Sequence, residues 1–465
     1  MISHPLPLHE TIAVAGVGAA GSAALRLLAP FATRLLAVDA RPDFPALPEK
    51  VELRPASQDI SPATALVISP GFNPEWPANQ HNPALMPWWQ AVRDGKVELV
   101  SEVELAAMAL PIPWITVGGT DGKSTTAALT AHLLKQILPG SVLGGNSWTA
   151  ISDIILQHPD APAAVVEVSA FQLQRGHRLR PRVAILTNIA PDHLDHYADF
   201  DAYCQAKHHI WAQMAEGDTV ILHGANEWLT ARVPDMKQKG IRVLAFDNSP
   251  ASGVGLDAWV HDDREMVVQT SAGEWRLAVG AMPLPGPHNL RNALAALLAL
   301  DALVPGCLQR CGAEQMREWM STFRGLPHRI EFVRQRRGVT WFNDSKATNV
   351  HAALTGLRAI KEPYIAIVGG VDKQLDLQPF FDELSHAAHV LVIGELTERF
   401  MKESAGQLRA VTPALDLADA VARAARLSQD GGSVLLAPAC SSFDMFRSFE
   451  HRGDVFRELV LALPD

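Results

Sequence analysis

The residues best suited to do chemistry lie in one short loop, 119–124, with the sequence Gly-Thr-Asp-Gly-Lys-Ser. Glycines let backbone N–H groups approach phosphate oxygens, and the helical pattern that follows, 127–138, would add partial positive charge at its N-terminus. Lys123 would reach the β- and γ-phosphates of a nucleotide, and the Ser124 hydroxyl would hold Mg²⁺. The full G-x-x-x-x-G-K-[ST] pattern lacks its first glycine, because position 117 is Val. The loop predicts a nucleotide-phosphate site, and the alternative is a structural glycine turn before a helix.

Two further places carry polar groups where chemistry is plausible. Glu167 interrupts the apolar run 163–168, and a carboxylate near the end of a buried strand is costly unless it pairs or binds a metal. Glu167 is therefore a Mg²⁺ candidate, with a solvent-facing strand end as the alternative. Asn289 and Asn292 lie before and at the start of a helical pattern, 292–303. They fit helix capping or recognition of an adenine edge equally well.

The beginning of the chain carries a second glycine pattern. Residues 11–15 read as a strand, 16–21 as G-x-G-x-x-G, and a further strand at 35–38 ends at Asp39. This arrangement predicts a Rossmann-like unit that holds a diphosphate and a ribose or base, although an Ala-rich helix packed on a strand gives the same pattern. A third strand, 66–68, leads into a loop at Ser69, at the sheet edge where such folds bind ligands.

These sites must be positioned by alternating strands and helices. Short β-branched runs alternate with longer helical patterns along most of the chain, which predicts an α/β fold with mainly parallel sheets. We expect three domains, at residues 1–110, 111–324 and 325–465. In the third, strand patterns at 364–368, 390–393 and 433–436 each lead to glycine or polar residues, as a ligand-binding edge requires.

Composition narrows the classes of function. Of 465 residues, 48% are hydrophobic and 19% are charged, so the chain can build several cores and is not disordered. A net charge of −10 argues against bulk binding to nucleic acid or anionic membranes. Four cysteines are too few for a disulfide scaffold. With no signal-peptide pattern at the beginning and no run of about 18 apolar residues, we expect a cytoplasmic enzyme without membrane insertion.

Taken together, these pieces resemble the Mur ligase family over essentially the whole chain and in the family's order. The loop 119–125 is similar to its G-T-x-G-K-S/T segment, which also explains the absent first glycine. The other segments that carry the resemblance are 167–173 (E-V-S-A-F-Q-L), 188–195 (N-I-A-P-D-H-L-D), 288–292 (H-N-L-R-N), 326–329 (L-P-H-R), 343–349 (N-D-S-K-A-T-N) and 438–453, which begins P-A-C-S-S-F-D-M-F. The chain departs from the family at Asp121, where Asn is usual, at Ala170, where a second Ser is usual, and in the loose segment 223–227.

The resemblance implies a Rossmann-like UDP-binding domain, a central P-loop-type ATPase domain and a Rossmann-like C-terminal domain that binds an amino acid. It implies ATP and Mg²⁺ as cofactors, and UDP-N-acetylmuramoyl-L-alanine and D-glutamate as the molecules joined. The reaction would be an ATP-dependent amide ligation through an acyl phosphate, in peptidoglycan precursor synthesis for cell wall biogenesis, cell shape and cell division. A monomer with no nucleic-acid partner is expected.

The resemblance also assigns roles to single residues. The implied catalytic residues are Lys123, Glu167, His193, Lys207, Asp344 and Lys346. ATP binding is implied for Gly119, Thr120, Asp121, Gly122, Lys123, Ser124, Thr125, Asn289, Asn292, Arg329 and Asp344. Binding of the UDP substrate is implied for Gly18, Asp39, Arg41, Ser69, Gly71, Asn146, Gln172 and His193. Amino-acid binding is implied for Thr348, Lys373, Ser442 and Phe449, and metal binding for Ser124, Glu167, His193 and a carbamylated Lys207.

Several alternatives stay open. Lys207 lies beside His208 and His209 and by pattern alone reads as a surface lysine. The same ligase chemistry could use L-glutamate or another acidic amino acid. A folate-polyglutamate-type ligase shares the phosphate loop, but that family lacks a leading UDP-binding domain. An NAD-dependent dehydrogenase would leave the loop 119–124 and Lys207 unexplained, and a non-catalytic nucleotide sensor would not need Lys123, Glu167, His193 and Lys207 together.

Overall fold

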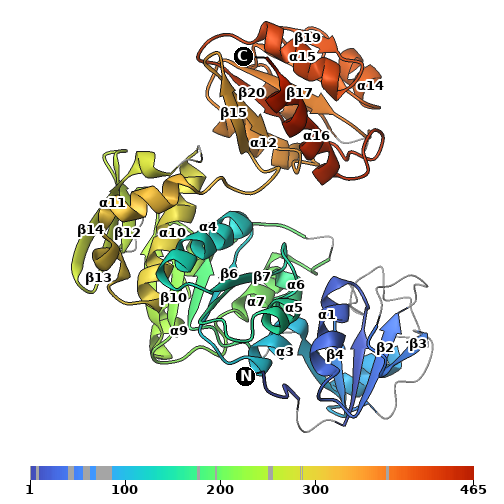
Figure 1. The fold of residues 1–465 in the computed structure, drawn as a ribbon, viewed down its shortest axis with the longest axis vertical. Helices are drawn as coiled ribbons and strands as arrows, with labels where there is room; N and C mark the ends of the chain where they lie inside the picture. The colour runs from blue at the N-terminus through green and yellow to red at the C-terminus, as the bar shows by residue number, and fades with distance from the viewer. Residues whose placement is uncertain are drawn as a thin grey trace. The chain divides into compact units, whose positions relative to one another are not determined.

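The computed structural model describes residues 2–6, 10–39, 47–55, 63–69, 86–174, 178–193, 196–249, 255–282, 284, 286–372 and 376–464. These residues form an α/β fold with three sheets, most of whose strand pairs are parallel (Figure 1). The chain divides into two compact units: Met1–Met282 with His288–Met320, and Pro283–Pro287 with Ser321–Asp465. Three residues with predicted binding roles, Arg41, Gly71 and Lys373, lie outside the described residues.

The first sheet is parallel and has the strand order β3-β2-β1-β4-β5. Its elements are β1 (Thr11–Ala15), α1 (Ala19–Leu28), β2 (Arg34–Asp39), β3 (Val51–Pro55), β4 (Ala65–Ile68), α2 (Met86–Arg93), β5 (Glu98–Ser101) and α3 (Glu102–Ala109). The predicted strands at 11–15, 35–38 and 66–68 are thus confirmed. Since β1 lies between β2 and β4, the strand order reverses at β1, and the crevice for a ligand is expected at its carboxyl end.

The central sheet follows in the same compact unit, with the order β14-β13-β12-β11-β10-β9-β6-β8-β7. Its strands are β6 (Trp114–Gly118), β7 (Val142–Gly145), β8 (Ala164–Glu167), β9 (Val183–Leu186), β10 (Thr219–His223), β11 (Arg242–Phe246), β12 (Ala258–His261), β13 (Glu265–Thr270) and β14 (Gly273–Ala278). Its helices are α4 (Lys123–Ile137), α5 (Ile151–Gln157), α6 (Ala170–Leu173), α7 (Phe200–His208), α8 (Glu227–Thr230), α9 (Val233–Gln238), the short 3-10 helix η1 (Val279–Ala281), α10 (Pro287–Leu303) and α11 (Cys307–Ser321).

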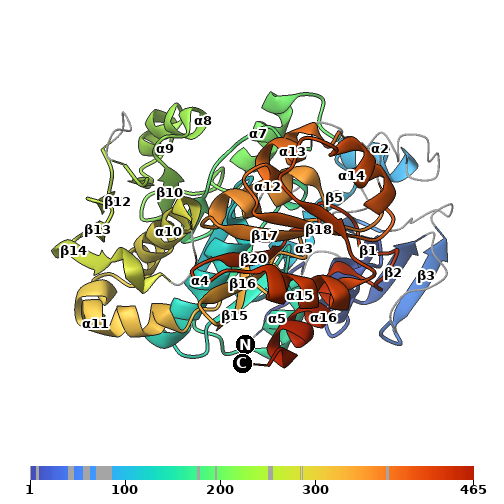
Figure 2. The same ribbon diagram turned by 90° about the horizontal axis from the view of Figure 1, so that it is seen from above.

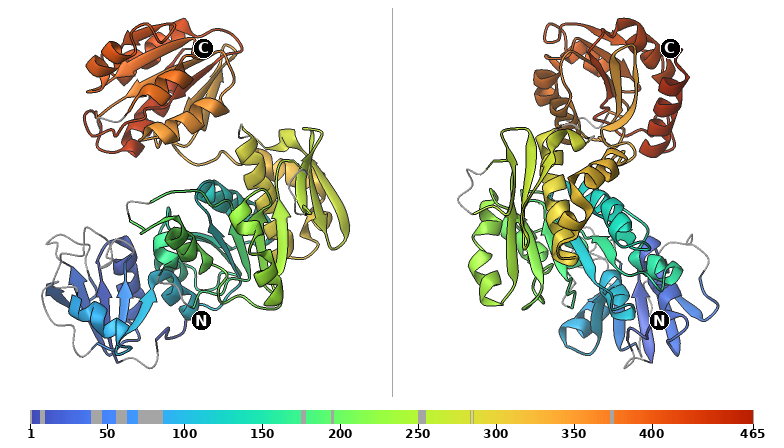
Figure 3. Two further views of the ribbon diagram at one scale, coloured as in Figure 1. Left: turned by 180° about the vertical axis from the view of Figure 1, so that it is seen from behind. Right: turned by 60° about the vertical axis from the view of Figure 1, so that its left-hand side comes forward.

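Two features of this sheet refine the sequence-based expectation. The last three strands, β12 to β14, form antiparallel hairpins at one edge of an otherwise parallel sheet (Figure 3). The helices α4 and α10 begin earlier than the apolar periodicity indicates. Helix α4 follows directly on Gly122, and α10 starts at Pro287, a residue whose fixed φ and missing N–H suit the first helical position.

Three helices join the first sheet to the central sheet: α1, α3 and α5 pack against one another (Figure 1). The Arg26 guanidinium on α1 forms a two-point ion pair with Asp153 on α5, with N–O distances of 2.8 and 2.6 Å. The Glu102 carboxylate at the start of α3 accepts the backbone N–H of Ser152 in the first turn of α5 at 2.7 Å. This hydrogen bond favours the ionised form of the Glu102 carboxyl, but burial opposes it more strongly.

The second unit has a sheet of order β15-β16-β20-β17-β18-β19, in which only β15 and β16 pair antiparallel among the described strands. Its elements are β15 (Glu331–Arg336), β16 (Val339–Asn343), α12 (Val350–Ala359), β17 (Tyr364–Gly369), α13 (Gln378–Leu384), β18 (His389–Ile393), α14 (Thr397–Glu403), β19 (Val411–Pro413), α15 (Leu417–Leu427), β20 (Ser433–Leu436) and α16 (Phe449–Ala462). Helices α12, α13 and α14 cover one face of the sheet and α15 and α16 the other (Figure 2).

Candidate active site

The phosphate loop connects β6 to α4 and depends on glycine at two positions. Gly119 has φ +133° and Gly122 has φ +77°, values that L side chains rarely adopt. A Cβ on Gly119 would lie 1.9 Å from the Thr187 hydroxyl oxygen, and a Cβ on Gly122 would lie 2.6 Å from Asn292 Oδ1. Both glycines therefore serve a tightly curved backbone under close packing. This backbone leads into the first turn of α4, where N–H groups that have no acceptor within the helix can bind an anion.

The segment after β9 holds this loop in place. Asn188 accepts the backbone N–H of Thr120 at 3.0 Å and of Asp121 at 2.8 Å through its side-chain oxygen. The Thr187 hydroxyl donates to the Asp121 carbonyl at 2.5 Å. Asp121 itself receives a weak contact from the Asn188 amide at 3.4 Å. The side chains of Thr187 and Asn188 thus hold the backbone of the loop in place before any nucleotide binds.

Two lysines converge on the loop from different helices. Lys123 donates to the Thr120 carbonyl at 2.6 Å, and Lys207 on α7 donates to the Gly119 carbonyl at 2.5 Å. Lys207 is 2% exposed and its ammonium lies 4.6 Å from the centre of the Tyr203 ring. Burial, and then the nearby charge of Lys123, lowers the pKa of Lys207 to about 7. The alternative of a surface lysine is therefore wrong, and a large share of the amine is unprotonated near pH 7.

Glu167 ends β8 beneath the loop and is 1% exposed, so the alternative of a solvent-facing strand end is also wrong. Its carboxylate accepts from the Ser147 hydroxyl at 2.9 Å, the Asn146 amide at 3.2 Å and the Trp148 indole N–H at 2.9 Å. The Ser124 hydroxyl donates to Ser147 at 3.2 Å. Ser124 and Glu167 thus both form a hydrogen bond with the Ser147 hydroxyl. Their oxygen atoms are hard ligands of the kind that Mg²⁺ prefers.

His193 lies on the same side of the loop but is not brought into a compact ligand cluster. It has φ +54°, and its ring centre lies 4.9 Å from that of Phe171 and 6.3 Å from that of Tyr203. Lys207 contacts the same tyrosine. Among the described residues no group of three or more His, Cys, Asp or Glu side chains is arranged to hold a metal ion.

The two asparagines of the predicted adenine site meet the phosphate loop. Asn292 accepts the Thr126 hydroxyl at 3.1 Å and donates to Asn289 at 3.2 Å, and both are buried. Because Asn292 Oδ1 also lies against Gly122, the first turns of α10 pack directly against the start of α4. An adenine at this place would lie beside the phosphates that the loop is built to hold.

In the first sheet, the candidates for the UDP substrate gather at the carboxyl end of β1. Gly18 caps α1, and the Asp39 carboxylate at the end of β2 accepts the backbone N–H of Val17 at 2.7 Å. The Ser69 amide donates to the Ala15 carbonyl at 2.9 Å. Gln172, in contrast, uses its side-chain oxygen to accept the backbone N–H and hydroxyl of Ser169 at the start of α6. Its amide nitrogen is the part that remains for a substrate.

In the second unit, Asp344 follows β16 and is 5% exposed. Its carboxylate accepts the backbone N–H of Ile330 at 3.1 Å. Burial raises the pKa of Asp344 to about 7, and Arg329 opposes this rise. Among the described residues, the buried Nε atom of Arg329 has no hydrogen-bond partner, which leaves this donor for a ligand oxygen.

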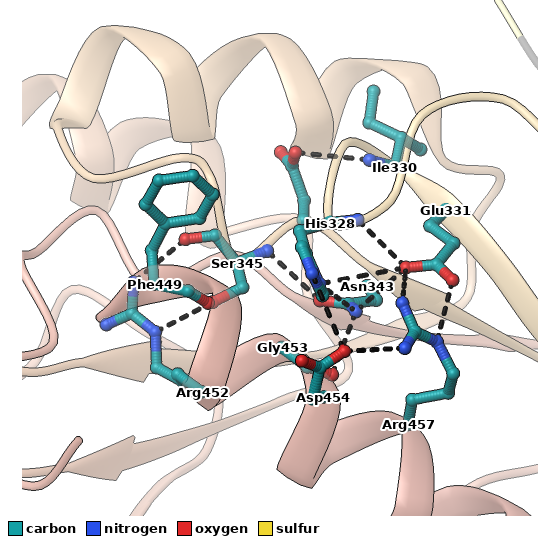
Figure 4. Close-up of polar contacts among 11 residues, drawn as sticks. His328, Ile330, Glu331, Asn343, Ser345, Phe449, Arg452, Gly453, Asp454 and Arg457 are labelled. Carbon is teal, nitrogen blue, oxygen red and sulfur yellow. Dashed lines mark hydrogen bonds and ion pairs between the residues drawn. The ribbon is translucent and has the colours of Figure 1, made fainter. Parts of the chain in front are cut away.

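A polar network holds this region against α16 (Figure 4). The Asn343 amide contacts His328 Nδ1 at 3.1 Å, Glu331 at 3.0 Å and the Gly453 carbonyl at 3.1 Å. Arg457 on α16 bonds Glu331 through two nitrogens, at 2.8 and 3.0 Å. The strand end that carries Asp344 is therefore fixed to the helix that begins at Phe449.

Phe449, one residue of the predicted amino-acid site, is the first residue of that helix. The Lys346 ammonium lies 5.4 Å from the centre of the Phe449 ring. Ser442 is 2% exposed and its hydroxyl has no hydrogen-bond partner among the described residues, which fits a ligand oxygen as the missing partner. Behind the pocket, the fully buried Arg452 bonds the Ser345 hydroxyl and carbonyl and the Cys440 carbonyl at 2.9–3.0 Å. Thr348 follows Lys346 closely, with its amide bonded to the Lys346 carbonyl at 2.8 Å.

Sequence reasoning missed the residues that support the site. Asn188 and Tyr203 fix the phosphate loop, Ser147 and Trp148 hold Glu167, and Arg452 joins two loops. Tyr203 carried one readable signal, because it precedes Lys207 by four residues on a helical pattern and so lies on the same face. Asn188 and Arg452 lie in the segments 188–195 and 438–453 that carry the family resemblance, but that resemblance assigned no role to them. Ser147 and Trp148 contact Glu167 across 20 and 19 positions, and no motif marked them.

The sequence of this chain matches known family models and known proteins. Residues 117–300 match the model of the Mur ligase middle domain, and residues 328–440 match that of the Mur ligase, glutamate ligase domain. The chain is 36% identical to the UDP-N-acetylmuramoylalanine--D-glutamate ligase of Anaeromyxobacter dehalogenans (strain 2CP-C), with 97% of each chain covered. It is 33% identical to the ligase of the same name from Geotalea uraniireducens (strain Rf4), with 98% of each covered.

Solved structures agree at the level of the fold. The UDP-N-acetylmuramate-alanine ligase MurC of Thermotoga maritima matches with a TM-score of 0.55 at 17% identity, covering 97% of this chain and 98% of that one. A pseudomurein peptide ligase type C from Methanothermus fervidus matches with a TM-score of 0.54 at 18% identity, covering 97% and 99%. With family models that span more than half of its length and relatives above 30% identity along nearly all of it, the chain belongs to the Mur ligase family.

Proposed function

We propose that this protein joins D-glutamate to UDP-N-acetylmuramoyl-L-alanine at the expense of ATP. The observation that carries the proposal is that relatives bearing the name of this ligase align with the chain from end to end, over 97–98% of both partners. The phosphate loop, the buried Glu167 and the buried Lys207, whose pKa is lowered to about 7, support an enzyme that handles nucleotide phosphates.

The first step transfers the γ-phosphoryl group of ATP to the alanyl carboxylate, forming an acyl phosphate and ADP. Two anionic groups must meet, so positive charge has to be in place beforehand. The Lys123 ammonium and the first-turn amides of α4 supply part of it. The loop bonds of Asn188 fix these donors in advance, which avoids reorganisation during the step.

Magnesium would be held by Ser124 and Glu167, and in a second position by His193 and the carbamate of Lys207. When bound, the cation neutralises charge on the phosphate oxygens and on the carboxylate. A lysine with a pKa of about 7 offers the unprotonated amine that reacts with carbon dioxide to form a carbamate and release a proton. Burial is thus what would turn a cationic side chain into an oxygen ligand.

In the second step the amine of D-glutamate attacks the acyl carbon. The C–N bond forms, the C–O bond to phosphate breaks, and phosphate leaves as the amine loses its proton. D-Glutamate carries two carboxylates, which need cations and hydroxyl groups. We assign Thr348, Ser442 and Phe449 to this pocket, together with Lys373 outside the described residues, and keep Lys346 as a proposed catalytic residue beside it.

The remaining proposals concern the other candidates and the setting. We assign Gly18, Asp39, Ser69, Asn146 and Gln172 to the UDP substrate, Asn289 and Asn292 to adenine, and Arg329 and Asp344 to the ribose and phosphates of ATP. The domain bounds at 110 and 324 also stay a proposal. No helix in the described part of the chain is long and apolar enough to cross a membrane. A monomer working on precursors in the cytoplasm is the setting we propose.

An isotope experiment tests the reaction and its intermediate together. UDP-N-acetylmuramoyl-L-alanine labelled with ¹⁸O in the alanyl carboxylate is incubated with ATP, Mg²⁺, D-glutamate and the protein. We expect one ¹⁸O atom in the released phosphate and a product heavier by one glutamyl residue in mass spectrometry. Product with unlabelled phosphate would reject the acyl phosphate, and no product would reject the ligase.

A further inference from the structure

The loop between β7 and α5 surrounds the Glu167 carboxylate. Its three successive residues Asn146, Ser147 and Trp148 each donate one hydrogen bond to that carboxylate. Asn146 is anchored in turn, because its backbone N–H donates to the Glu167 carbonyl at 2.9 Å. A single loop thus fixes both the main chain and the side chain of a proposed metal ligand.

The distribution of these donors over the two oxygens is unequal. A carboxylate has about four lone-pair positions, two on each oxygen. Oε1 accepts from both Ser147 and Asn146, whereas within the described part of the chain Oε2 accepts only from the Trp148 indole. One lone pair, on Oε2, is therefore left for a cation. Glu167 is set up to bind a metal through one oxygen rather than two.

Ser147 also orders the second proposed ligand. The Ser124 hydroxyl donates to Ser147 Oγ at 3.2 Å, and Ser147 passes its own proton to Glu167 Oε1 at 2.9 Å. The chain of hydrogen bonds has one direction, because the carboxylate can only accept. It commits the Ser124 proton to Ser147, which leaves the lone pairs of Ser124 Oγ for a cation.

We propose that Ser147 and Trp148 are positioning residues that set the metal geometry of this enzyme: Ser147 aligns Ser124 with Glu167, and Trp148 restricts Glu167 to one-oxygen binding. The inference rests on the proposed function, since it presumes that Ser124 and Glu167 bind Mg²⁺. Mg²⁺ requires near-octahedral geometry with short bonds, whereas Ca²⁺ accepts carboxylates through both oxygens. The indole bond should therefore favour Mg²⁺ over Ca²⁺.

The test measures metal binding directly. Mn²⁺ stands in for Mg²⁺, and its binding to the full-length protein with ADP is followed by electron paramagnetic resonance, with Ca²⁺ and Mg²⁺ as competitors. The variants are Ser147→Ala, Ser147→Thr, which keeps the hydroxyl, and Trp148→Phe. Trp275→Phe is the matched control, because the Trp275 indole nitrogen is buried without a hydrogen-bond partner. Thermal unfolding of each variant checks that the fold is kept.

Ser147→Ala should weaken Mn²⁺ binding about tenfold or more, the usual effect of losing a partner of a metal ligand, and Ser147→Thr should restore it. Trp148→Phe should raise the effectiveness of Ca²⁺ relative to Mg²⁺ as a competitor at least threefold, while Trp275→Phe leaves that ratio unchanged. The inference is overturned if Ser147→Ala binds Mn²⁺ like the unaltered protein, or if both tryptophan variants give the same ratio.

The unaltered protein separates this inference from the proposed function. If it binds no Mn²⁺ with ADP, the metal site of the proposed function is rejected, and the inference falls with it. If it binds Mn²⁺ and the Ser147 and Trp148 variants behave like it, only the inference is rejected.

Discussion

At the scale of single residues, the phosphate loop shows what a sequence reveals and what it hides. The pattern Gly-Thr-Asp-Gly-Lys-Ser predicted an anion site from residue types alone. The pattern did not show that Gly122 packs against Asn292, because the two residues are 170 positions apart. Nor did it show that Lys207 is buried, since Lys-His-His reads as surface until α7 is packed on the loop.

Replacing Gly122 with Ala should damage nucleotide binding through a clash as well as through strain. A Cβ there would lie 2.6 Å from Asn292 Oδ1. Gly140→Ala is the matched control, because Gly140 also has a positive φ, +90°, but its Cβ would meet only Pro162 Cδ at 3.5 Å. We expect calorimetric titration with ADP to show at least tenfold weaker binding for Gly122→Ala and unchanged binding for Gly140→Ala. Equal affinities in the two variants would contradict the packing argument.

The low pKa of Lys207 makes a second prediction at this scale. A neutral amine reacts with carbon dioxide, so a protein kept in ¹³C-bicarbonate at pH 8 should show a carbamate resonance in its ¹³C spectrum. Lys207→Met should lack the resonance, and Lys239→Met, which removes an exposed lysine, should retain it. A carbamate that persists in Lys207→Met would assign the modification elsewhere and remove Lys207 from the metal site.

At the scale of elements, buried parallel strands were the most predictable part of the fold. Runs such as Thr11–Ala15 and Tyr364–Gly369 are continuous and β-branched because both faces of their sheets are covered. The antiparallel hairpins β12 to β14 escaped prediction. Their alternating polar residues belong to a sheet edge with one open face, and such short runs differ little from loop sequence.

The helix junction between the first and central sheets carries a buried carboxyl, Glu102. Burial raises the pKa of Glu102 to about 7, with the hydrogen bonds from Ser152 opposing the rise. A raised pKa contributes stability that is fully present below the unfolded value of 4.5 and is lost as the pH rises through about 7. Ionised Glu102 therefore weakens the junction at pH 8.

Glu102→Gln should remove this loss. Urea denaturation gives the free energy of unfolding of both proteins at pH 5 and pH 8. From pH 5 to pH 8, we expect the difference between variant and unaltered protein to shift in favour of the variant by on the order of 2–3 kcal/mol. Other groups that titrate in this range, such as Asp344, are common to both proteins and cancel in the difference. Asp160→Asn, an exposed site, serves as control. A difference that is the same at both pH values would place Glu102 outside the pH dependence.

At the scale of the whole molecule, the proposed reaction draws on both compact units. Lys123, Glu167 and Lys207 lie in the first unit, and Asp344, Lys346 and Ser442 lie in the second. The order of segments along the sequence predicted this division of labour through family resemblance, and the roles of the single residues stay predictions. What the sequence could not supply is the choice between D- and L-glutamate, because the handedness of an amino acid is read by atoms in three dimensions and not by residue types.

The most direct test of the account is phosphate release from ATP in the presence of UDP-N-acetylmuramoyl-L-alanine and Mg²⁺, with D-glutamate, L-glutamate or neither. Lys123→Met, which removes the loop cation, is the inactive control. The account predicts release that requires the nucleotide sugar and D-glutamate together. Release with L-glutamate instead would keep the reaction class and change the product. Release that needs neither an amino acid nor the nucleotide sugar would contradict the account.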